Sequence, residues 1–415
     1  MDLLKFITAG SVDDGKSTLI GRLLYDTNSV LDDQLEAIQQ ANRKNNDGTL
    51  DLAILTDGLK AEREQGITID VAYKYFQTKK RKFIIADAPG HIQYTRNMVT
   101  GASNADLAII LIDARKGVVE QTRRHSFIVA LLATPHVLIC VNKMDMVDYD
   151  QAVFDKVKDD YERLRESLNI QQVDYIPVSA LKGDNIVSWS ANMPWYAGKP
   201  MLDFLETVAI NRVSETAKAR FPVQWVIRPQ TDELHDYRGY AGRVIGGTFQ
   251  VGDPIVVLPS SFSSTIKRIE LATNELDIAE NGASVVIHLA DNIDIGRGDI
   301  LVKQYELPPV SQQFEADICW MDTKPLDLKQ VYLLQHHSKL TKIKILDILY
   351  RIDIQTLGKA NGGDFGLNDI GQIQFKSAEP LTIEPYKENK SNGGAILIDP
   401  RNHLTVAALM VTKSE

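Results

Sequence analysis

One short stretch near the start of the chain has the residue types and the spacing of a phosphate-binding loop. Gly10 and Gly15 frame four residues and are followed by a lysine and two hydroxyl residues, the pattern G-x-x-x-x-G-K-[ST]. Glycines let backbone N–H groups converge on a phosphate, and a helix N-terminus adds partial positive charge there. The residues predicted to bind a nucleotide here are Gly10, Ser11, Val12, Asp13, Asp14, Gly15, Lys16, Ser17 and Thr18.

The neighbouring segments predict the strand and the helix that would hold this loop. Residues 3–9 are mostly apolar, and residues 19–25 repeat apolar side chains at helical spacing. The alternative is a chance glycine turn between a strand and a helix. It is disfavoured because every specified position of the motif carries the required residue. Asp13 and Asp14 are unexpected beside a polyphosphate because like charges repel, so they would point away or serve a cation.

Two later segments carry side chains that would complete a phosphate and metal site. Thr68 would close over the γ-phosphate, in a loop that this phosphate orders, although residues 60–70 alone indicate only a charged helix ending at a glycine. Asp87 ends an apolar strand, and His91 follows where an attacking water would lie; a helix N-cap and a surface histidine are the alternatives. This second nucleotide-binding group is Asp87, Ala88, Pro89, Gly90 and His91.

These segments together predict the chemistry of the site. Lys16 would reach the β- and γ-phosphates of a nucleotide. The predicted catalytic residues are His91, Lys16 and Thr68, and the predicted Mg²⁺ ligands are Ser17, Thr68 and Asp87.

Base selection is predicted at the ends of two further strands. Asp145 would accept hydrogen bonds from guanine N1–H and the exocyclic amino group together, a donor pair that adenine lacks. Asn142 would reach N7, and the stem of Lys143 would lie over the ring. The predicted base-binding residues are Asn142, Lys143, Met144 and Asp145. A second segment, formed by Ser179, Ala180 and Leu181, would offer a backbone N–H to guanine O6. The set predicts a GTP- and Mg²⁺-binding switch domain over residues 1–211, and it disfavours a generic P-loop ATPase.

From about residue 221 the pattern changes to short alternating runs separated by glycine turns. Strands this short, at a spacing near ten residues, favour closed barrels. We therefore expect a multidomain protein: an α/β P-loop GTPase domain, with a mostly parallel sheet and helices on both faces, followed by two small antiparallel β-barrels over residues 222–307 and 310–415. The pair His336-His337 has no metal-ligand companions nearby in the sequence and is predicted to be solvated.

Composition is typical of a globular protein of two to four domains, with 415 residues, 44% hydrophobic residues and a formal net charge of −9. This negative charge does not indicate binding to nucleic acid or to a membrane surface, both of which attract positively charged proteins. Of the two cysteines, Cys140 lies in an apolar run and is predicted to be a buried free thiol. No signal-like segment precedes the first strand and no apolar stretch reaches spanning length, so we expect a cytoplasmic protein.

The order of these motifs resembles the elongation-factor-type translational GTPases over essentially the whole chain. Within that superfamily, four stretches are similar to the large GTPase subunits of bacterial sulfate adenylyltransferase: residues 10–18, 90–98, 113–126 and 392–399. Translation factors usually carry histidine where Ser11 stands, and bacterial ones also where Asp14 stands. Ile92 departs from the glutamate expected in the sulfate family.

This resemblance implies a subunit that couples GTP hydrolysis to the formation of adenosine 5′-phosphosulfate and pyrophosphate from ATP and sulfate. It implies GTP and Mg²⁺ as cofactors, and a hetero-oligomer with a small adenylyltransferase subunit that performs the adenylyl transfer. No nucleic acid or membrane partner is expected. The sequence agrees, since it contains no Ser-Gly-Gly-x-Asp-Ser loop and no His-x-Gly-His signature for a second nucleotide site. The alternative is an elongation factor that delivers aminoacyl-tRNA to the ribosome.

Overall fold

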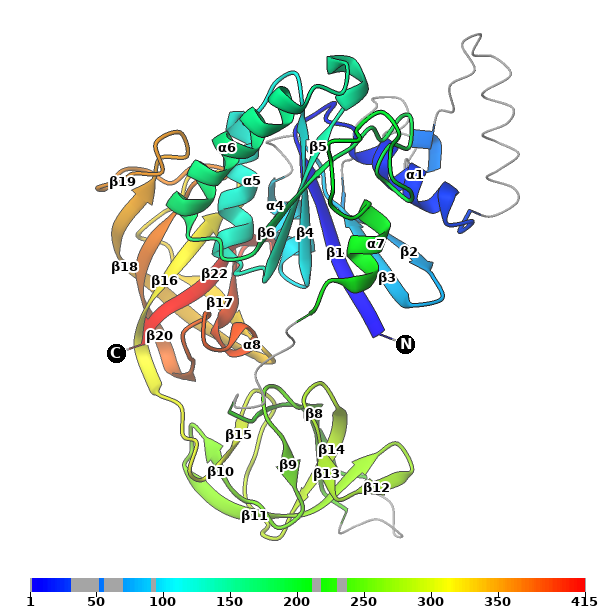
Figure 1. Cartoon of the computed structure of the whole chain (residues 1–415). Helices are drawn as coiled ribbons and strands as arrows, with labels where there is room; N and C mark the ends of the chain where they lie inside the picture. Colours follow the sequence, from blue (N-terminus) through cyan, green and yellow to red (C-terminus); the bar gives the residue numbers. More distant parts are fainter. Residues whose placement is uncertain are drawn as a thin grey trace. The chain divides into compact units, whose positions relative to one another are not determined.

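The computed structural model describes residues 2–30, 52–55, 70–90, 95–210, 218–229 and 237–414. These residues form two compact units, the first built on the chain up to Ile210 and the second on nearly all of the chain that follows. Figure 1 shows both units coloured along the sequence.

The first unit contains a six-stranded sheet, counted over the described residues, in the order β2-β3-β1-β4-β5-β6. All neighbours are parallel except β2, which runs antiparallel to β3. Every residue of β4 is buried, as expected for a strand covered on both faces. The strands are β1 (Asp2–Gly10), β2 (Ala72–Gln77), β3 (Arg81–Asp87), β4 (Leu107–Asp113), β5 (His136–Asn142) and β6 (Val173–Pro177).

Helices cover both faces of this sheet, with α1 and α7 on one side and α5 and α6 on the other (Figure 1). Helix α6 shows why they form: it buries Phe154, Val157 and Tyr161 at helical spacing, and the Asp150 carboxylate caps its start by accepting from the Ala152 N–H. The described helices are α1 (Lys16–Asp26), η1 (Leu52–Leu55), α4 (Thr95–Ala102), α5 (Glu120–Leu131), η3 (Met144–Val147), α6 (Gln151–Leu168) and α7 (Met201–Thr207).

The second unit holds two closed antiparallel barrels. In the first barrel, six strands in the order β10-β15-β7-β8-β14-β11 close through a β10–β11 pairing among the described residues. Its strands are β7 (Arg220–Ile227), β8 (Gly239–Arg243), β9 (Phe249–Gln250), β10 (Pro254–Leu258), β11 (Phe262–Leu271), β12 (Asn274–Leu276), β13 (Ile278–Ala279), β14 (Ser284–Leu289) and β15 (Ile300–Lys303).

In the second barrel, six strands in the order β17-β21-β22-β16-β20-β18 close through β17–β18, again over the described residues. Its elements are β16 (Val310–Trp320), β17 (Tyr332–His336), β18 (Lys339–Ile352), β19 (Lys359–Ala360), β20 (Ile370–Thr382), α8 (Lys390–Gly393), β21 (Gly394–Ile398) and β22 (Thr405–Ser414). The predicted fold class, an α/β domain followed by two barrels, is confirmed.

The prediction for the histidine pair is wrong. His336 is only 3% exposed, and its Nε2 lies 2.9 Å from the Asn392 carbonyl oxygen. Burial lowers the pKa of His336 to about 3, so the ring is neutral. The residue pattern of β17 could not show this, because the Asn392 partner comes from α8, 56 residues away along the chain. Cys140 is buried and free, as predicted.

Candidate nucleotide-binding site

The phosphate loop joins β1 to α1, in the strand–loop–helix order predicted from the sequence. Gly15 has a φ of 93°, and a Cβ there would lie 2.5 Å from the Asn142 side chain. Glycine adopts this left-handed conformation without strain, so both the backbone and the space require it. Asp13 also has a positive φ, of 65°, and is exposed.

Lys16 lies at the centre of the loop with 6% of its surface exposed. Its Nζ donates to the Gly10 carbonyl at 2.9 Å and to the Ser11 carbonyl at 3.0 Å. Burial lowers the pKa of Lys16, while the nearby carboxylates of Asp87 and Asp14 act to raise it. Because charged acceptors make stronger hydrogen bonds than carbonyls, a phosphate can replace these two partners.

The structure explains how Asp14 is tolerated in a phosphate loop. Its carboxylate turns back into the loop, where Oδ2 accepts from the Ser11 N–H at 2.6 Å, and the residue is 2% exposed. Burial raises the pKa of Asp14, which the Ser11 hydrogen bond and Lys16 partly offset. Asp14 therefore braces the loop backbone.

The segment from Asp87 to Gly90 lies directly against this loop. Asp87, at the end of β3, is 1% exposed, and its Oδ1 accepts from the Thr8 hydroxyl of β1 at 3.1 Å. A Cβ on Gly90 would lie 2.5 Å from the Lys16 Nζ and 2.9 Å from the Gly10 carbonyl oxygen. Only glycine fits this close approach. The prediction missed Thr8, whose signal is a hydroxyl in an otherwise apolar strand.

Asn142 joins the phosphate loop to the base-binding segments. Its Nδ2 donates to the Asp14 carbonyl oxygen at 2.7 Å, and its Oδ1 accepts from the Ala180 N–H at 3.0 Å. The residue is 2% exposed. Its predicted contact with guanine N7 stays a prediction, but its position between the two segments is fixed by these hydrogen bonds.

Lys143 and Asp145 begin the turn after β5. Lys143 has a φ of 63°, and its Nζ lies 3.1 Å from Oδ2 of the buried Asp113. Arg115 donates to both oxygens of Asp113, at 3.0 Å and 2.6 Å. Burial would raise the pKa of Asp113, but the hydrogen bonds from Arg115 and Lys143 hold that pKa well below its ordinary value. Asp145 lies in η3 and is partly exposed.

The second base-binding segment is held by helix α1. Arg22 donates from Nε to the Ala180 carbonyl at 3.2 Å and from Nη2 to the Leu181 carbonyl at 2.6 Å. The Ser179 hydroxyl accepts from the Lys182 N–H at 3.2 Å. Among the residues that the structure describes, those predicted to bind the phosphates and those predicted to bind the base thus lie together at the carboxyl ends of the sheet strands.

Comparison with known proteins identifies the family of this chain. A family model described as the Elongation factor Tu GTP binding domain matches residues 1–215, and one described as GTP-eEF1A C-terminal domain-like matches residues 313–412. Sulfate adenylyltransferase subunit 1 of Psychromonas ingrahamii is 48% identical over 415 residues, covering 100% of this chain and 87% of that protein. This chain belongs to the sulfate adenylyltransferase subunit 1 family.

Two further comparisons extend this result. The bifunctional enzyme CysN/CysC of Mycobacterium tuberculosis is 47% identical and covers 99% of this chain, which spans 67% of that longer protein. The crystal structure of the S. cerevisiae Ski7 GTPase-like domain, bound to GTP, has a TM-score of 0.53 and 18% identity over 99% of this chain and 97% of that one. At this identity the likeness shows the shared fold alone.

Two predicted residues of this family's site, Thr68 and His91, lie outside the described residues, as does Ile92. Their predicted roles stay predictions. Sequence reasoning also missed Arg22, Asp113 and Arg115, which act as supports. Arg22 had no local signal, because its partner Ala180 is 158 residues away along the chain.

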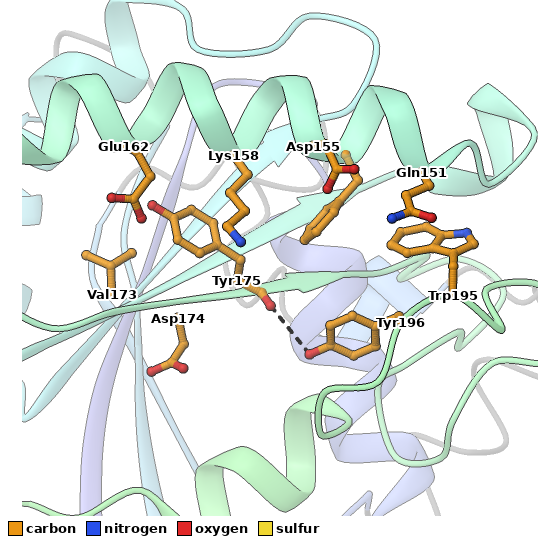
Figure 2. A pocket seen from close by; sticks show the side chains of 10 residues that line it. Gln151, Asp155, Lys158, Glu162, Val173, Asp174, Tyr175, Trp195 and Tyr196 are labelled. Carbon is orange, nitrogen blue, oxygen red and sulfur yellow. Dashed lines mark hydrogen bonds between the residues drawn. The ribbon is translucent and has the colours of Figure 1, made fainter.

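A separate pocket of about 500 Å³ lies beside the edge strand β6. Figure 2 shows its lining from α6, including Lys158 and Glu162, opposite Trp195 and Tyr196. The Tyr196 hydroxyl donates to the Tyr175 carbonyl at 3.4 Å. None of the predicted nucleotide-binding residues lines this pocket, so it is distinct from the nucleotide site. No helix among the described residues is long and apolar enough to cross a membrane.

Proposed function

We propose that this chain is the GTP-hydrolysing subunit of a sulfate adenylyltransferase. It would couple GTP hydrolysis to the formation of adenosine 5′-phosphosulfate and pyrophosphate from ATP and sulfate. Membership of the sulfate adenylyltransferase subunit 1 family supports the reaction. The observation that carries the GTPase part is the Asn142 brace, which joins the phosphate loop to Ala180. Asn142 itself lies three residues before Asp145, which would select guanine.

The described residues fit a nucleoside triphosphate with Mg²⁺. The Gly90 cradle, which a Cβ would fill, and the buried Lys16 ammonium face the same space at the end of β1. Lys16 would exchange its two loop carbonyls for oxygens of the β- and γ-phosphates. Ser17 and Asp87 would hold Mg²⁺ together with Thr68, and the ion would neutralise charge on the phosphates. His91 would orient the attacking water.

We assign the adenylyl transfer to a small partner subunit. The name of the relatives, subunit 1, supports a heteromeric assembly. A cytoplasmic location and the absence of nucleic-acid and membrane partners stay predictions from the sequence. The elongation-factor alternative is disfavoured, because proteins named sulfate adenylyltransferase subunit 1 match nearly the whole chain at 48% identity.

Nucleotide titration followed by a stimulation assay tests this proposal. The chain alone should bind GTP and GDP in preference to ATP, and it should hydrolyse GTP slowly. Addition of the small subunit with ATP and sulfate should accelerate hydrolysis, because partner binding favours the ordered state of a switch. Stimulation by aminoacyl-tRNA and ribosomes, with indifference to sulfate, would instead support the elongation-factor alternative.

A further inference from the structure

We propose that Gln121, at the start of α5, is a positioning residue for GTP hydrolysis that acts by holding the Gly90 peptide. Its Nε2 donates to the Gly90 carbonyl oxygen at 3.0 Å, across 31 residues of chain. This inference rests on the proposed function, since it concerns the same nucleotide site. Gln121 was part of a family-like stretch in the sequence, but the sequence assigned it no role.

The Gly90 peptide packs so closely against the phosphate loop that a small displacement of it would act on Lys16. Gly90 is buried, and its Cα lies so close to Lys16 that an added Cβ would be 2.5 Å from Nζ. A peptide unit is planar, so the Gly90 carbonyl and the N–H of residue 91 turn together. A donor that fixes this carbonyl therefore fixes the Gly90 peptide beside Lys16, and the predicted catalytic histidine is the next residue in the sequence.

The hydrogen bonds of Gln121 determine which way its amide points. Its Oε1 is buried and has no partner among the described residues. If the amide were turned over, Oε1 would face the Gly90 carbonyl oxygen, and two acceptors would repel. The donor bond to Gly90 therefore sets the orientation of the Gln121 amide.

Helix α5 holds the backbone of Gln121 in a fixed position. The Thr122 hydroxyl accepts from the Val119 N–H at 3.4 Å, which closes the first turn. The Ser126 hydroxyl donates to the Thr122 carbonyl at 2.8 Å and lies 3.0 Å from the Tyr161 hydroxyl of α6. Thr122 and Ser126 are buried. The donor on Gln121 is thus attached to a packed helix pair rather than to a loop.

The test compares the Gln121→Glu and Gln121→Ala variants with the wild-type chain. Glutamate has the same shape but places a carboxylate oxygen against the Gly90 carbonyl, and alanine removes the donor. We expect the single-turnover rate of GTP hydrolysis to fall about 10- to 100-fold in both variants, the range for a misplaced reacting group. GDP affinity and the melting temperature should stay close to the wild-type values.

The matched control is Gln151→Glu, the same change at the first residue of α6 in the separate pocket of Figure 2. It should leave hydrolysis and GDP binding unchanged. Wild-type rates in both Gln121 variants, or a parallel loss of GDP affinity and stability, would overturn the positioning role. A wild-type chain that binds no guanine nucleotide would overturn the proposed function itself, and this role with it.

Discussion

The two ends of the nucleotide site differ in how their side chains are already engaged. At the base end, Asn142 and Arg22 hold the Ala180 segment, and Asp113 holds Lys143. At the phosphate end, the Lys16 ammonium is bonded to carbonyls of its own loop. We therefore expect the base end to keep its partners when a nucleotide binds, and the phosphate end to exchange them.

This difference separates recognition from switching. We expect a braced base end to select guanine without reorganisation, and so to contribute equally to GTP and GDP binding. A phosphate end that exchanges hydrogen-bond partners can respond to the γ-phosphate, which GTP has and GDP lacks. Variants at the two ends should consequently fail in different steps.

The largest effect is expected at the phosphate end. His91→Ala should bind GTP normally but hydrolyse it about 10²- to 10⁴-fold more slowly, because the water loses the group that orients it. Lys16→Ala should instead weaken nucleotide binding, since the buried charged donor to the phosphates is lost. Rapid-quench hydrolysis and equilibrium titration separate the two steps. If both variants fail at the same step, this division of roles is wrong.

At the base end, Asp145→Asn should reduce GTP affinity by about 2 to 4 kcal/mol, because an amide mismatches the two guanine donors. The amide would donate to the 2-carbonyl of xanthine, so affinity should move from GTP toward xanthosine triphosphate. Competition between the two nucleotides measures this change. Unchanged GTP binding would remove Asp145 from the base pocket.

The brace between the two ends is broken by Asn142→Ala. The Ala180 N–H and the Asp14 carbonyl would lose their partner, at a cost of about 1 to 3 kcal/mol. GTP and GDP affinity should fall together, without a change in base preference. Asn192→Ala, on an exposed residue, is the control. A loss confined to GTP would show that Asn142 belongs to the switching end.

The smallest expected effect is a loss of folding stability at acidic pH, caused by the buried His125. Burial, with Lys16 and Arg124 nearby, lowers the pKa of His125 to about 3. In the unfolded chain, the histidine side chain has its ordinary pKa of about 6.5 and binds a proton below that pH, whereas the buried ring of the folded chain does not. The stability of the fold therefore decreases as the pH falls below about 6.5. At pH 5.5 the loss of folding free energy from this residue is on the order of 1 kcal/mol.

Thermal unfolding at pH 7.5 and 5.5 checks this prediction. The His125→Gln variant should lose less stability than wild type over that interval, and His403→Gln, on an exposed turn, is the control. An identical pH dependence in wild type and His125→Gln would contradict the assignment of a neutral buried ring.

Sequence alone predicts the parts of this molecule that depend on local spacing. The strand, loop and helix around Gly15, and the alternating runs of the barrels, follow from periodicity and turn residues. The supports Arg22 and Gln121 could not be predicted, because their partners lie far away along the chain. Thr8 has a distant partner too, but its hydroxyl in an otherwise apolar strand was a signal that the prediction did not use. The burial of His336 was missed for the same reason, since its pairing with Asn392 spans 56 residues.

The most direct test of the central claim is pyrophosphate release by the purified chain and the small adenylyltransferase subunit, supplied with ATP and sulfate. We predict release that depends on GTP, is not fully sustained by a non-hydrolysable GTP analogue, and is lost in the Asp145→Asn complex until xanthosine triphosphate is added. Release that is indifferent to GTP, or GTP hydrolysis that is indifferent to ATP and sulfate, would contradict the account.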